Sequence, residues 1–308
     1  MIAMGRRDCG HDQEPQRRGR GCYLADNETP PWTARPNPIR SSSMFLLGLA
    51  TCVLLTACSG KPDYPKPEEL PNADQFVDQL TAKQAAARSF QAESRMDYRV
   101  GDDRIKTTVL VMGERSAKVR FNALNPDDTV AADLACDGIN FSFVDFNKNC
   151  QLAGPCTSDA IASLLRVNLE PDDFLALAIG SVPLIPNAES SAAWNPKSGT
   201  VVLQRVSRDM TRQEIVLDGR KATYDVIRAT VRDPDNHIEW SLENKDYADV
   251  KANDGTPFRV PGKTRFQQPK SNGDLKIRWQ NRTLNLDLSD DKFMMVLPGL
   301  AECGAKKQ

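Results

Sequence analysis

Apolar and polar residues alternate one by one through much of the second half of the chain, and this pattern restricts the fold more than any other feature. Ile238, Trp240 and Leu242 alternate with Glu239 and Ser241. A period of two places successive side chains on opposite faces of a β-strand. One face of each strand is then exposed to solvent and the other is buried, which is typical of antiparallel sheets.

The same alternation recurs along most of the chain. A turn at residues 101–103 separates two such stretches and predicts a β-hairpin. The expected strands lie at residues 96–100, 105–111, 119–123, 139–143, 202–206, 215–217, 224–228, 238–242, 275–279, 284–288 and 293–296. A sheet of roughly ten strands must curl or close on itself.

Helical periodicity interrupts this pattern in three places. Asn72 can cap a helix that we expect to continue to about Ala92. Thr157 or Ser158 can begin a second helix, and Pro171 a third, which Gly180 ends. We therefore predict a mainly β (α+β) fold in which a single curled antiparallel sheet wraps around two central helices.

Residues 44–58 form an apolar run with a basic flank before it and the box Leu55, Thr56, Ala57, Cys58 behind it. The run is shorter than the ~20 residues of a transmembrane helix and is typical of a secretory signal. The box resembles the bacterial lipobox. This resemblance implies cleavage before Cys58, and a covalent diacylglycerol and N-acyl chain at Cys58 as the only added groups.

These features divide the chain into four predicted parts. Residues 1–57 form a leader, in which 1–43 have the composition of an over-extended start, and residues 58–72 form a lipidated, proline-rich tether. Residues 73–302 form one folded domain and residues 303–308 a polar tail. Seven of the 40 basic and five of the 41 acidic residues fall in the leader, so the rest carries a net charge of about −3. No basic stripe is visible, and we expect no nucleic-acid partner.

Four of the eight cysteines follow the lipobox, namely Cys136, Cys150, Cys156 and Cys303. An exported chain keeps disulfides, but four cysteines can pair in three ways and the sequence does not choose among them. Cys150 and Cys156 would close the shortest loop and are the candidate pair. No histidine or Cys-x-x-Cys pair accompanies these cysteines, so we predict no metal site.

Catalysis has little support in the sequence. His237 is the one histidine after the lipobox, and the alternation places it on the polar side of its strand. No nucleophile elbow or phosphate loop is present. Paired acids at 127–128, 172–173 and 290–291 are typical of turns and helix caps. We predict a protein that is not an enzyme.

Three parts of the chain, residues 118–126, 169–183 and 257–298, resemble the lipoprotein-localisation (LolA/LolB-like) family, closest to its outer-membrane receptor. The resemblance implies an incomplete β-barrel with helices lying in its mouth as a lid. In the receptor, the loop corresponding to residues 125–128 presents an apolar residue, whereas here it is Asn-Pro-Asp-Asp.

A lipid-binding cavity needs an apolar concave lining with few polar groups. The residues expected to line it, from strands and lid, are Tyr98, Phe121, Phe141, Phe143, Phe174, Leu175, Ile179, Trp240 and Trp279. The same residues could instead fill an ordinary core. Arg205 and Arg228 are expected to face solvent, although an inward arginine could hold the lid.

The resemblance and the lipobox together predict a monomeric lipoprotein, anchored in the outer membrane and facing the periplasm. It would bind acyl chains of lipoproteins or phospholipid in lipoprotein sorting, with a periplasmic carrier protein as a further partner. The alternative is a non-catalytic envelope assembly lipoprotein that uses the same fold to bind a protein.

Overall fold

The computed structural model describes residues 63–100, 103–165, 169–221 and 223–304. The leader, the lipidation site Cys58 and the end of the tail lie outside these residues. Cys58–Gln308 form a compact unit that contains the whole hydrophobic cluster and both disulfides, so we expect this unit to fold by itself. Within the described residues, no helix is long and apolar enough to cross a membrane.

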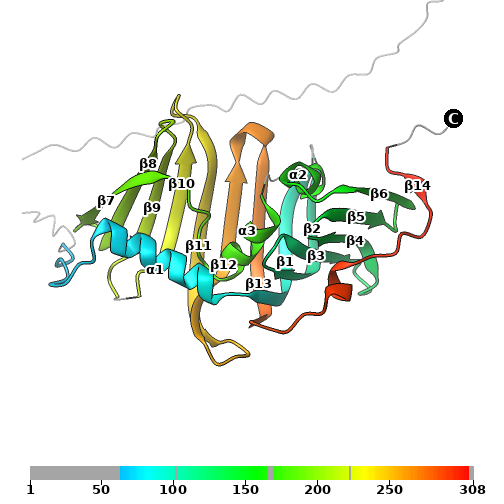
Figure 1. The fold of residues 1–308 in the computed structure, drawn as a ribbon, viewed down its shortest axis with the longest axis horizontal. Coiled ribbons are helices and arrows are strands. Elements are labelled where there is room, and N and C mark those ends of the chain that lie inside the picture. The colour runs from blue at the N-terminus through cyan, green and yellow to red at the C-terminus, as the bar shows by residue number, and fades with distance from the viewer. Residues whose placement is uncertain (1–62, 101–102, 166–168, 222, 305–308) are drawn as a thin grey trace, which may run out of the picture. The chain divides into compact units, whose positions relative to one another are not determined.

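One sheet of 14 strands makes up most of the described part of the chain, and it is curled but does not close (Figure 1). Its strands are β1 (Ser89–Val100), β2 (Asp103–Glu114), β3 (Lys118–Leu124), β4 (Val130–Asp137), β5 (Asn140–Asp145), β6 (Cys150–Pro155), β7 (Ala188–Asn195), β8 (Thr200–Ser207), β9 (Arg212–Asp218), β10 (Val226–Arg232), β11 (Ile238–Lys251), β12 (Pro257–Gln268), β13 (Gly273–Leu284) and β14 (Ala301–Glu302). The predicted fold class, a curled antiparallel sheet forming an incomplete barrel, is confirmed.

The sheet consists of two meanders joined side by side. Strands β1 to β6 follow one another across one half, and β7 to β13 across the other. Antiparallel pairing of β1 with β13 joins the halves, with Met96 opposite Ile277. The short β14 adds to β6 in parallel. Because β6 and β7 lie in opposite halves, the chain between them must cross the face of the sheet.

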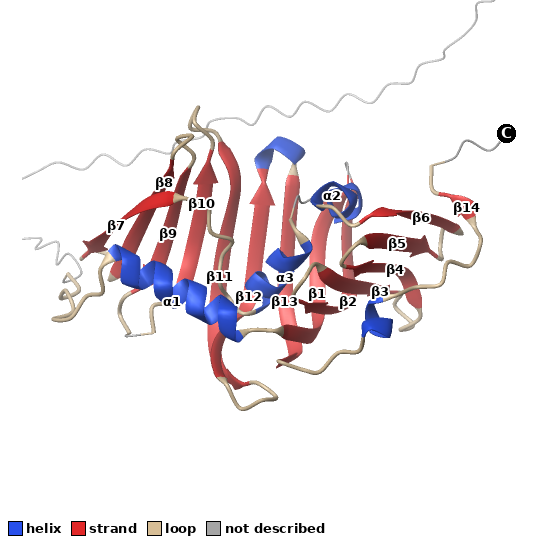
Figure 2. Ribbon diagram, in the orientation of Figure 1, coloured by secondary structure: helices blue, strands red, loops and turns tan. Residues whose placement is uncertain are grey.

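That crossing segment carries helices α2 (Ser158–Leu165) and α3 (Pro171–Ala178), which we call the lid. A third helix, α1 (Ala73–Ala86), lies across β8 to β11 on the same face (Figure 2). The helix α1 contacts β7, α2 contacts β1, and α3 contacts β1, β2, β3 and β12. All three helices therefore cover one face of the sheet.

The start of α1 confirms the predicted cap. The Asn72 side chain accepts from the Gln75 backbone at 2.9 Å, and the Gln75 side chain accepts from the Asn72 backbone at 2.8 Å. The predicted end at Ala92 is wrong, because β1 already begins at Ser89. Before the helix, Tyr64 donates its backbone N–H to the carbonyl oxygen of Pro196, which places the tether against the turn between β7 and β8.

The strands predicted at 284–288 and 293–296 are absent from the sheet. β13 ends at Leu284, and Asp290–Phe293 form a short 3₁₀ helix, η2. A second one, η1, spans Pro269–Ser271. The list of expected strands also lacks β4, β6, β7, β12 and β14. Of these, β4, β6 and β7 have small or polar residues at many positions, β12 has Pro261 and Gly262 in its middle, and β14 is only two residues long. Their alternation is too weak to show in the sequence.

The hydrophobic core lies between the helices and the sheet. Side chains along β13 alternate between buried and more exposed from Gly273 to Gln280, so one face packs inward and the other meets water. Phe90, Phe174 and Phe266 are fully buried in this core. The sheet therefore has an inner, apolar face under the helices and an outer, charged face.

Candidate functional site

The nine residues predicted to line a lipid cavity all lie in one hydrophobic cluster on the inner face. Six are buried, and Tyr98, Phe143 and Trp240 pack against them with partial exposure. The rings of Phe121 on β3 and Phe174 on α3 meet edge to face, with 4.8 Å between their centres. The structure thus brings the predicted residues together, and side chains of the lid pack against those of the sheet.

The lid is the main apolar contributor from outside the sheet. From Phe174 to Ala178 every residue of α3 is buried, and Ile179 just after it is fully buried. Burial of a large apolar side chain stabilises a fold by about 1.5–3 kcal/mol. Apolar packing is therefore the main force that holds the lid on the sheet, and polar contacts at its two ends fix its position.

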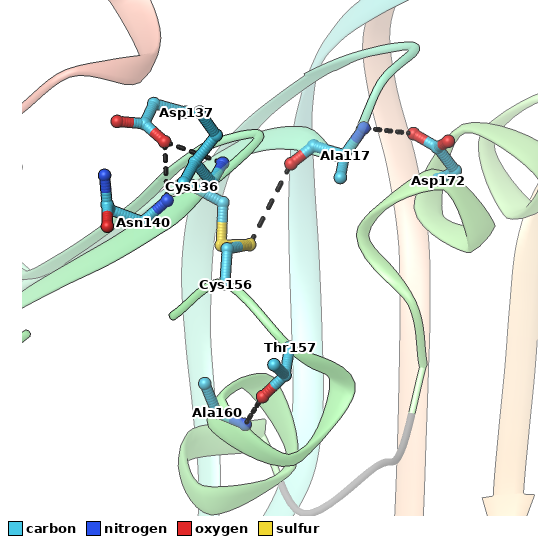
Figure 3. The surroundings of a disulfide bond; sticks show 9 residues. Ala117, Cys136, Asp137, Asn140, Cys156, Thr157, Ala160 and Asp172 are labelled. Carbon is cyan, nitrogen blue, oxygen red and sulfur yellow. Dashed lines mark hydrogen bonds between the residues drawn. A yellow bond between two sulfur atoms is a disulfide. The ribbon is translucent and has the colours of Figure 1, made fainter. Parts of the chain in front are cut away.

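A disulfide holds the start of the lid (Figure 3). Cys156, just before α2, is bonded to Cys136 at the end of β4, with 5.7 Å between their Cα atoms. The Thr157 hydroxyl accepts from the backbone of Ala160 at 3.2 Å and caps the helix. The first turn of α2 is therefore covalently fixed to the sheet.

The second disulfide joins Cys150 to Cys303, with 4.9 Å between Cα atoms. The prediction of disulfides is confirmed, but the candidate pair Cys150–Cys156 is wrong. These two cysteines stand at opposite ends of β6, and six residues of extended strand span roughly 20 Å. A disulfide needs Cα atoms within about 7 Å. Cys303, predicted to lie in a polar tail, is part of the fold.

The start of α3 is held by two carboxylates. The Asp172 side chain accepts from the backbone N–H of Ala117, in the turn between β2 and β3, at 2.9 Å (Figure 3). Asp173 accepts from the backbone N–H of Glu170 at 2.9 Å. Burial raises the pKa of Asp173 to about 6, with Glu170 and Asp172 adding to the rise and the Glu170 hydrogen bond opposing it.

The end of α3 is held by Arg282 of β13. Its guanidinium donates to the carbonyl oxygens of Ala178, the last residue of α3, and of Pro261 on β12. The guanidinium also lies 5.2 Å from the centre of the Trp279 ring. Burial lowers the pKa of Arg282 to about 10. One side chain therefore joins the lid to the middle of the sheet.

A local irregularity turns Arg282 inward. Asn281 has φ of 42°, in the left-handed region that asparagine tolerates better than most residues. The pairing of β1 with β13 shifts at the same place, between Gln91 and Glu93. Such a bulge shifts the alternation by one residue. Arg282 then lies on the inner face, whereas Arg278 lies exposed on the outer face.

A buried polar cluster surrounds Gly180, two residues after the end of α3. Gly180 has φ of 69°, and its carbonyl oxygen accepts from the Tyr247 hydroxyl at 3.0 Å. Burial is the main cause of the strongly raised pKa of Tyr247. Lys83 of α1 donates to the carbonyl oxygen of Arg259 at 2.8 Å, and burial lowers its pKa to about 8. This cluster ties α1 and the end of the lid to β11 and β12.

The loop after the lid is held by an inward arginine. Arg205 is buried and donates to the Gln213 side chain at 3.3 Å. Gln213 in turn donates to the carbonyl oxygen of Pro183 at 2.6 Å. The prediction that Arg205 faces solvent is therefore wrong. Arg228 does face outward, where it lies 3.9 Å from Glu214.

The sequence prediction missed Arg282, Tyr247 and Gln213 as residues that hold the lid. Arg282 follows Asn281 in a stretch whose alternation breaks, and that break is the one signal that could have shown it. Tyr247 likewise follows Asp246, which has φ of 58°. In both strands a left-handed residue turns the next side chain inward.

The groups that could suggest catalysis or metal binding have other tasks. Asp233, Asp235 and His237 lie close enough to hold a cation, but Asp233 already pairs with Lys270 at 2.9 Å and accepts from the His237 backbone at 2.9 Å. His237 is exposed. Of the paired acids, Asp127 bonds Thr129 in its turn and Asp290 pairs with Lys118. These carboxylates serve turns, caps and ion pairs.

The fold is similar to that of several solved bacterial proteins. A domain from Vibrio parahaemolyticus, described as an outer membrane lipoprotein-sorting protein, aligns with a TM-score of 0.50 and 12% identity, covering 72% of this chain and 97% of its own. A DUF1329 family protein from Desulfovibrio piger aligns with a TM-score of 0.49 and 14% identity, covering 72% and 97%. A LolA superfamily protein from Nitrosomonas europaea aligns with a TM-score of 0.48 and 10% identity, covering 73% and 99%.

At such identities the comparison shows a shared fold and no more, so the resemblance to lipoprotein-localisation proteins is confirmed in fold. No family model matches the sequence, and no curated protein does.

Proposed function

We propose that this protein is a non-enzymatic periplasmic lipoprotein that binds acyl chains of lipoproteins or phospholipid between the sheet and the lid. Its anchor would be the covalent diacylglycerol and N-acyl chain at Cys58, in the outer membrane. The observation that carries the proposal is the crossing segment itself. It covers an aromatic inner face through apolar contacts, and polar bonds hold it mainly at its ends.

Burial of the lid's apolar side chains and burial of an acyl chain on the inner face would release similar free energies. Four large apolar residues at the end of the lid, Phe174, Leu175, Leu177 and Ile179, are buried. Exposing them would cost about 6–12 kcal/mol, at 1.5–3 kcal/mol each. Burying an acyl chain of ~14 methylenes would return on the order of 10 kcal/mol. An acyl chain could thus replace α3 with little net change in free energy.

Arg282 is suited to sense this exchange. Its Nε–H is buried and has no acceptor among the described residues, while its two other nitrogens hold Ala178 and Pro261. An ester or carboxylate oxygen at the head of an acyl chain is an acceptor of the required kind. Arg282 would release the lid and bind the acyl head group in the same step.

The test uses residues 59–308, exported to a periplasm so that both disulfides form. Native mass spectrometry of the purified protein reports co-purified lipid. Titration with brominated palmitate then reports quenching of Trp279. The centre of its ring lies 6.2 Å from that of Phe90 within the core. Saturable quenching that Trp279→Phe removes would support the proposal. A protein that purifies without lipid and whose Trp279 fluorescence does not change with brominated palmitate would contradict the proposal.

A second function is favoured by one observation, the packing of the inner-face aromatics against the protein's own side chains. A non-catalytic envelope assembly lipoprotein would need no cavity and would use its surface to bind a protein partner. A periplasmic carrier protein is a candidate partner for either function. Failure of the palmitate titration, together with a stable complex in crosslinking from whole periplasm, would favour this second function.

A further inference from the structure

A cavity of about 850 Å³ lies in the described part of the chain, apart from the predicted lipid-binding residues. It is lined by β1, β2, β11, β12 and β13, and by the end of β3 with the loop that follows it. Its lining includes seven lysines or arginines and three acids, although the chain as a whole carries a slight negative charge. The charged side chains alternate with core residues, so they belong to the outer face. We call this cavity the basic groove.

Strand register arranges the charges of the basic groove in two rows. The first row runs across β11, β12, β13, β1 and β2 as Glu243, Arg265, Lys276, Asp97 and Lys106. Acids and bases are interspersed along this row. Its charges therefore compensate one another within the sheet.

The second row does not compensate itself. Lys245 lies opposite Lys263, Lys263 opposite Arg278, and Arg278 opposite Arg95. Four cations thus follow one another across four strands with no acid between them. Like charges directly opposite on neighbouring strands destabilise a sheet. An arrangement that works against folding is expected where a function requires it.

Part of this row also has no partner elsewhere. Lys245 pairs with Glu243 at 2.8 Å and Lys263 with Asp246 at 2.7 Å. Arg95 and Arg278 are exposed, and neither forms an ion pair with any described residue. The centre of the row therefore offers two free guanidinium groups, which suit phosphate oxygens.

Exposed apolar side chains lie at one rim of the basic groove. Leu110 follows Thr108 on the outer face of β2 and is 40% exposed. Val130 and Phe146, 39% and 50% exposed, flank the loop between β3 and β4. The Asn147 side chain donates to the Asn125 side chain at 3.2 Å, which ties Phe146's turn to the loop that lines the groove.

We propose that the basic groove docks on the phosphate head groups of an anionic lipid bilayer. The cationic row spans about 14 Å at the usual strand spacing, which is wider than a single phosphate. Its combination of cations with exposed apolar residues fits a lipid interface better than an acidic polypeptide. The basic groove lies on the outer face, so its binding to a bilayer does not depend on whether the inner face binds acyl chains.

Cosedimentation of residues 59–308 with vesicles tests the proposal. Binding to phosphatidylcholine vesicles that contain phosphatidylglycerol is expected, with little binding to phosphatidylcholine alone and a decline as salt increases. The double variant Arg95→Gln/Arg278→Gln should bind these vesicles roughly tenfold more weakly, since each cation near the surface contributes to the binding free energy. Both residues are exposed, and thermal melting should show that the variant folds.

The matched control is Arg208→Gln/Lys251→Gln, which removes the same charge from exposed positions outside the groove. Equal losses for both double variants, or equal binding to neutral vesicles, would overturn the proposal. Phe146→Ser should weaken binding most at high salt, where apolar contacts remain. An unchanged affinity of Phe146→Ser at high salt would argue against an interfacial ligand.

Two soluble competitors distinguish other sources of negative charge. Glycerol 1-phosphate should displace the vesicles no better than sodium chloride of the same ionic strength. Stronger displacement would mean that the groove takes a single phosphate instead of a surface. Poly-glutamate could instead bind more tightly than the vesicles and lose the same affinity in the Arg95→Gln/Arg278→Gln variant. That result would show that the ligand of the groove is an acidic polypeptide and not a bilayer.

Discussion

Arg282 donates one hydrogen bond to the carbonyl oxygen of Ala178 and another to that of Pro261, so a single side chain joins the end of α3 to strand β12. Both acceptors are backbone carbonyl groups of buried residues. The bond to Ala178 can break only if α3 moves away from the sheet or if Arg282 finds another acceptor. This relationship makes Arg282 the residue through which lid position and ligand binding are coupled.

Arg282→Leu should loosen the lid. Two buried carbonyl groups lose their donor, and each unsatisfied group costs about 1–3 kcal/mol. We expect a lower free energy of unfolding in urea titrations and faster uptake of brominated palmitate in stopped-flow quenching. Arg208→Leu, which replaces an exposed arginine outside the basic groove, is the control and should change neither. A slower uptake by the Arg282 variant would contradict the role of the bond as a latch.

Gly180→Ala should destabilise the end of the lid. The added Cβ would lie 2.5 Å from Pro261 Cδ and 2.9 Å from the Tyr247 hydroxyl, and φ is 69°. The left-handed conformation alone costs about 1–2 kcal/mol with a side chain. Gly255→Ala is the matched control, since φ is 86° there but the nearest contact is 3.6 Å. Thermal melting should show a larger loss for Gly180→Ala, and equal losses would mean that packing against Pro261 is unimportant.

Stability should depend on the protonation of Asp173. Its folded pKa of about 6 lies above the usual aspartate value of 3.8, so the folded state holds the proton more tightly than the unfolded state. This contribution is present below about pH 4 and is lost as pH rises towards 6. Asp173→Asn should therefore flatten the decline in the free energy of unfolding between these pH values.

The control for Asp173→Asn is Asp74→Asn, which removes an exposed acid from the first turn of α1. It should leave the slope between pH 4 and pH 6 as in the wild type. Urea titrations at several pH values measure both variants. An unchanged slope in Asp173→Asn would show that other groups cause the pH dependence.

The two disulfides should differ in their contribution to stability. The Cys150–Cys303 bond closes a loop with a sequence separation of 153, against 20 for Cys136–Cys156. Loop-closure entropy gives about 5 and about 3 kcal/mol as upper values. Paired Cys→Ala variants, compared by urea unfolding, should lose stability in that order. The reverse order would show that packing around the buried Cys136 outweighs chain entropy.

The sequence predicted the features that depend on neighbouring residues. The capping box at Asn72 and the strand through Trp240 follow from local spacing, and both are present. The inner-face aromatics also followed from alternation. Such patterns need only that each strand has one buried face.

What the sequence could not predict depends on residues far apart in the chain. The partner of Cys150 is 153 positions away, beyond the reach of any local pattern. Arg282 turns inward because one left-handed residue shifts the alternation, which a regular period cannot anticipate. The row that contains Arg95 and Arg278 exists only through strand register. A search of the sequence for basic runs cannot find this row, since the row runs across strands and not along the chain.

The two edges of the sheet are unequal. At one edge, β14 pairs with the first two residues of β6 and is fixed by the Cys150–Cys303 bond, so only residues 152–155 of β6 remain beside it. At the other edge, β7 presents eight residues, and within the described chain no further strand pairs with it. A second copy would therefore add at β7, the longer of the two edges. Pairing through backbone hydrogen bonds would then end with a symmetric dimer and could not continue into a fibre.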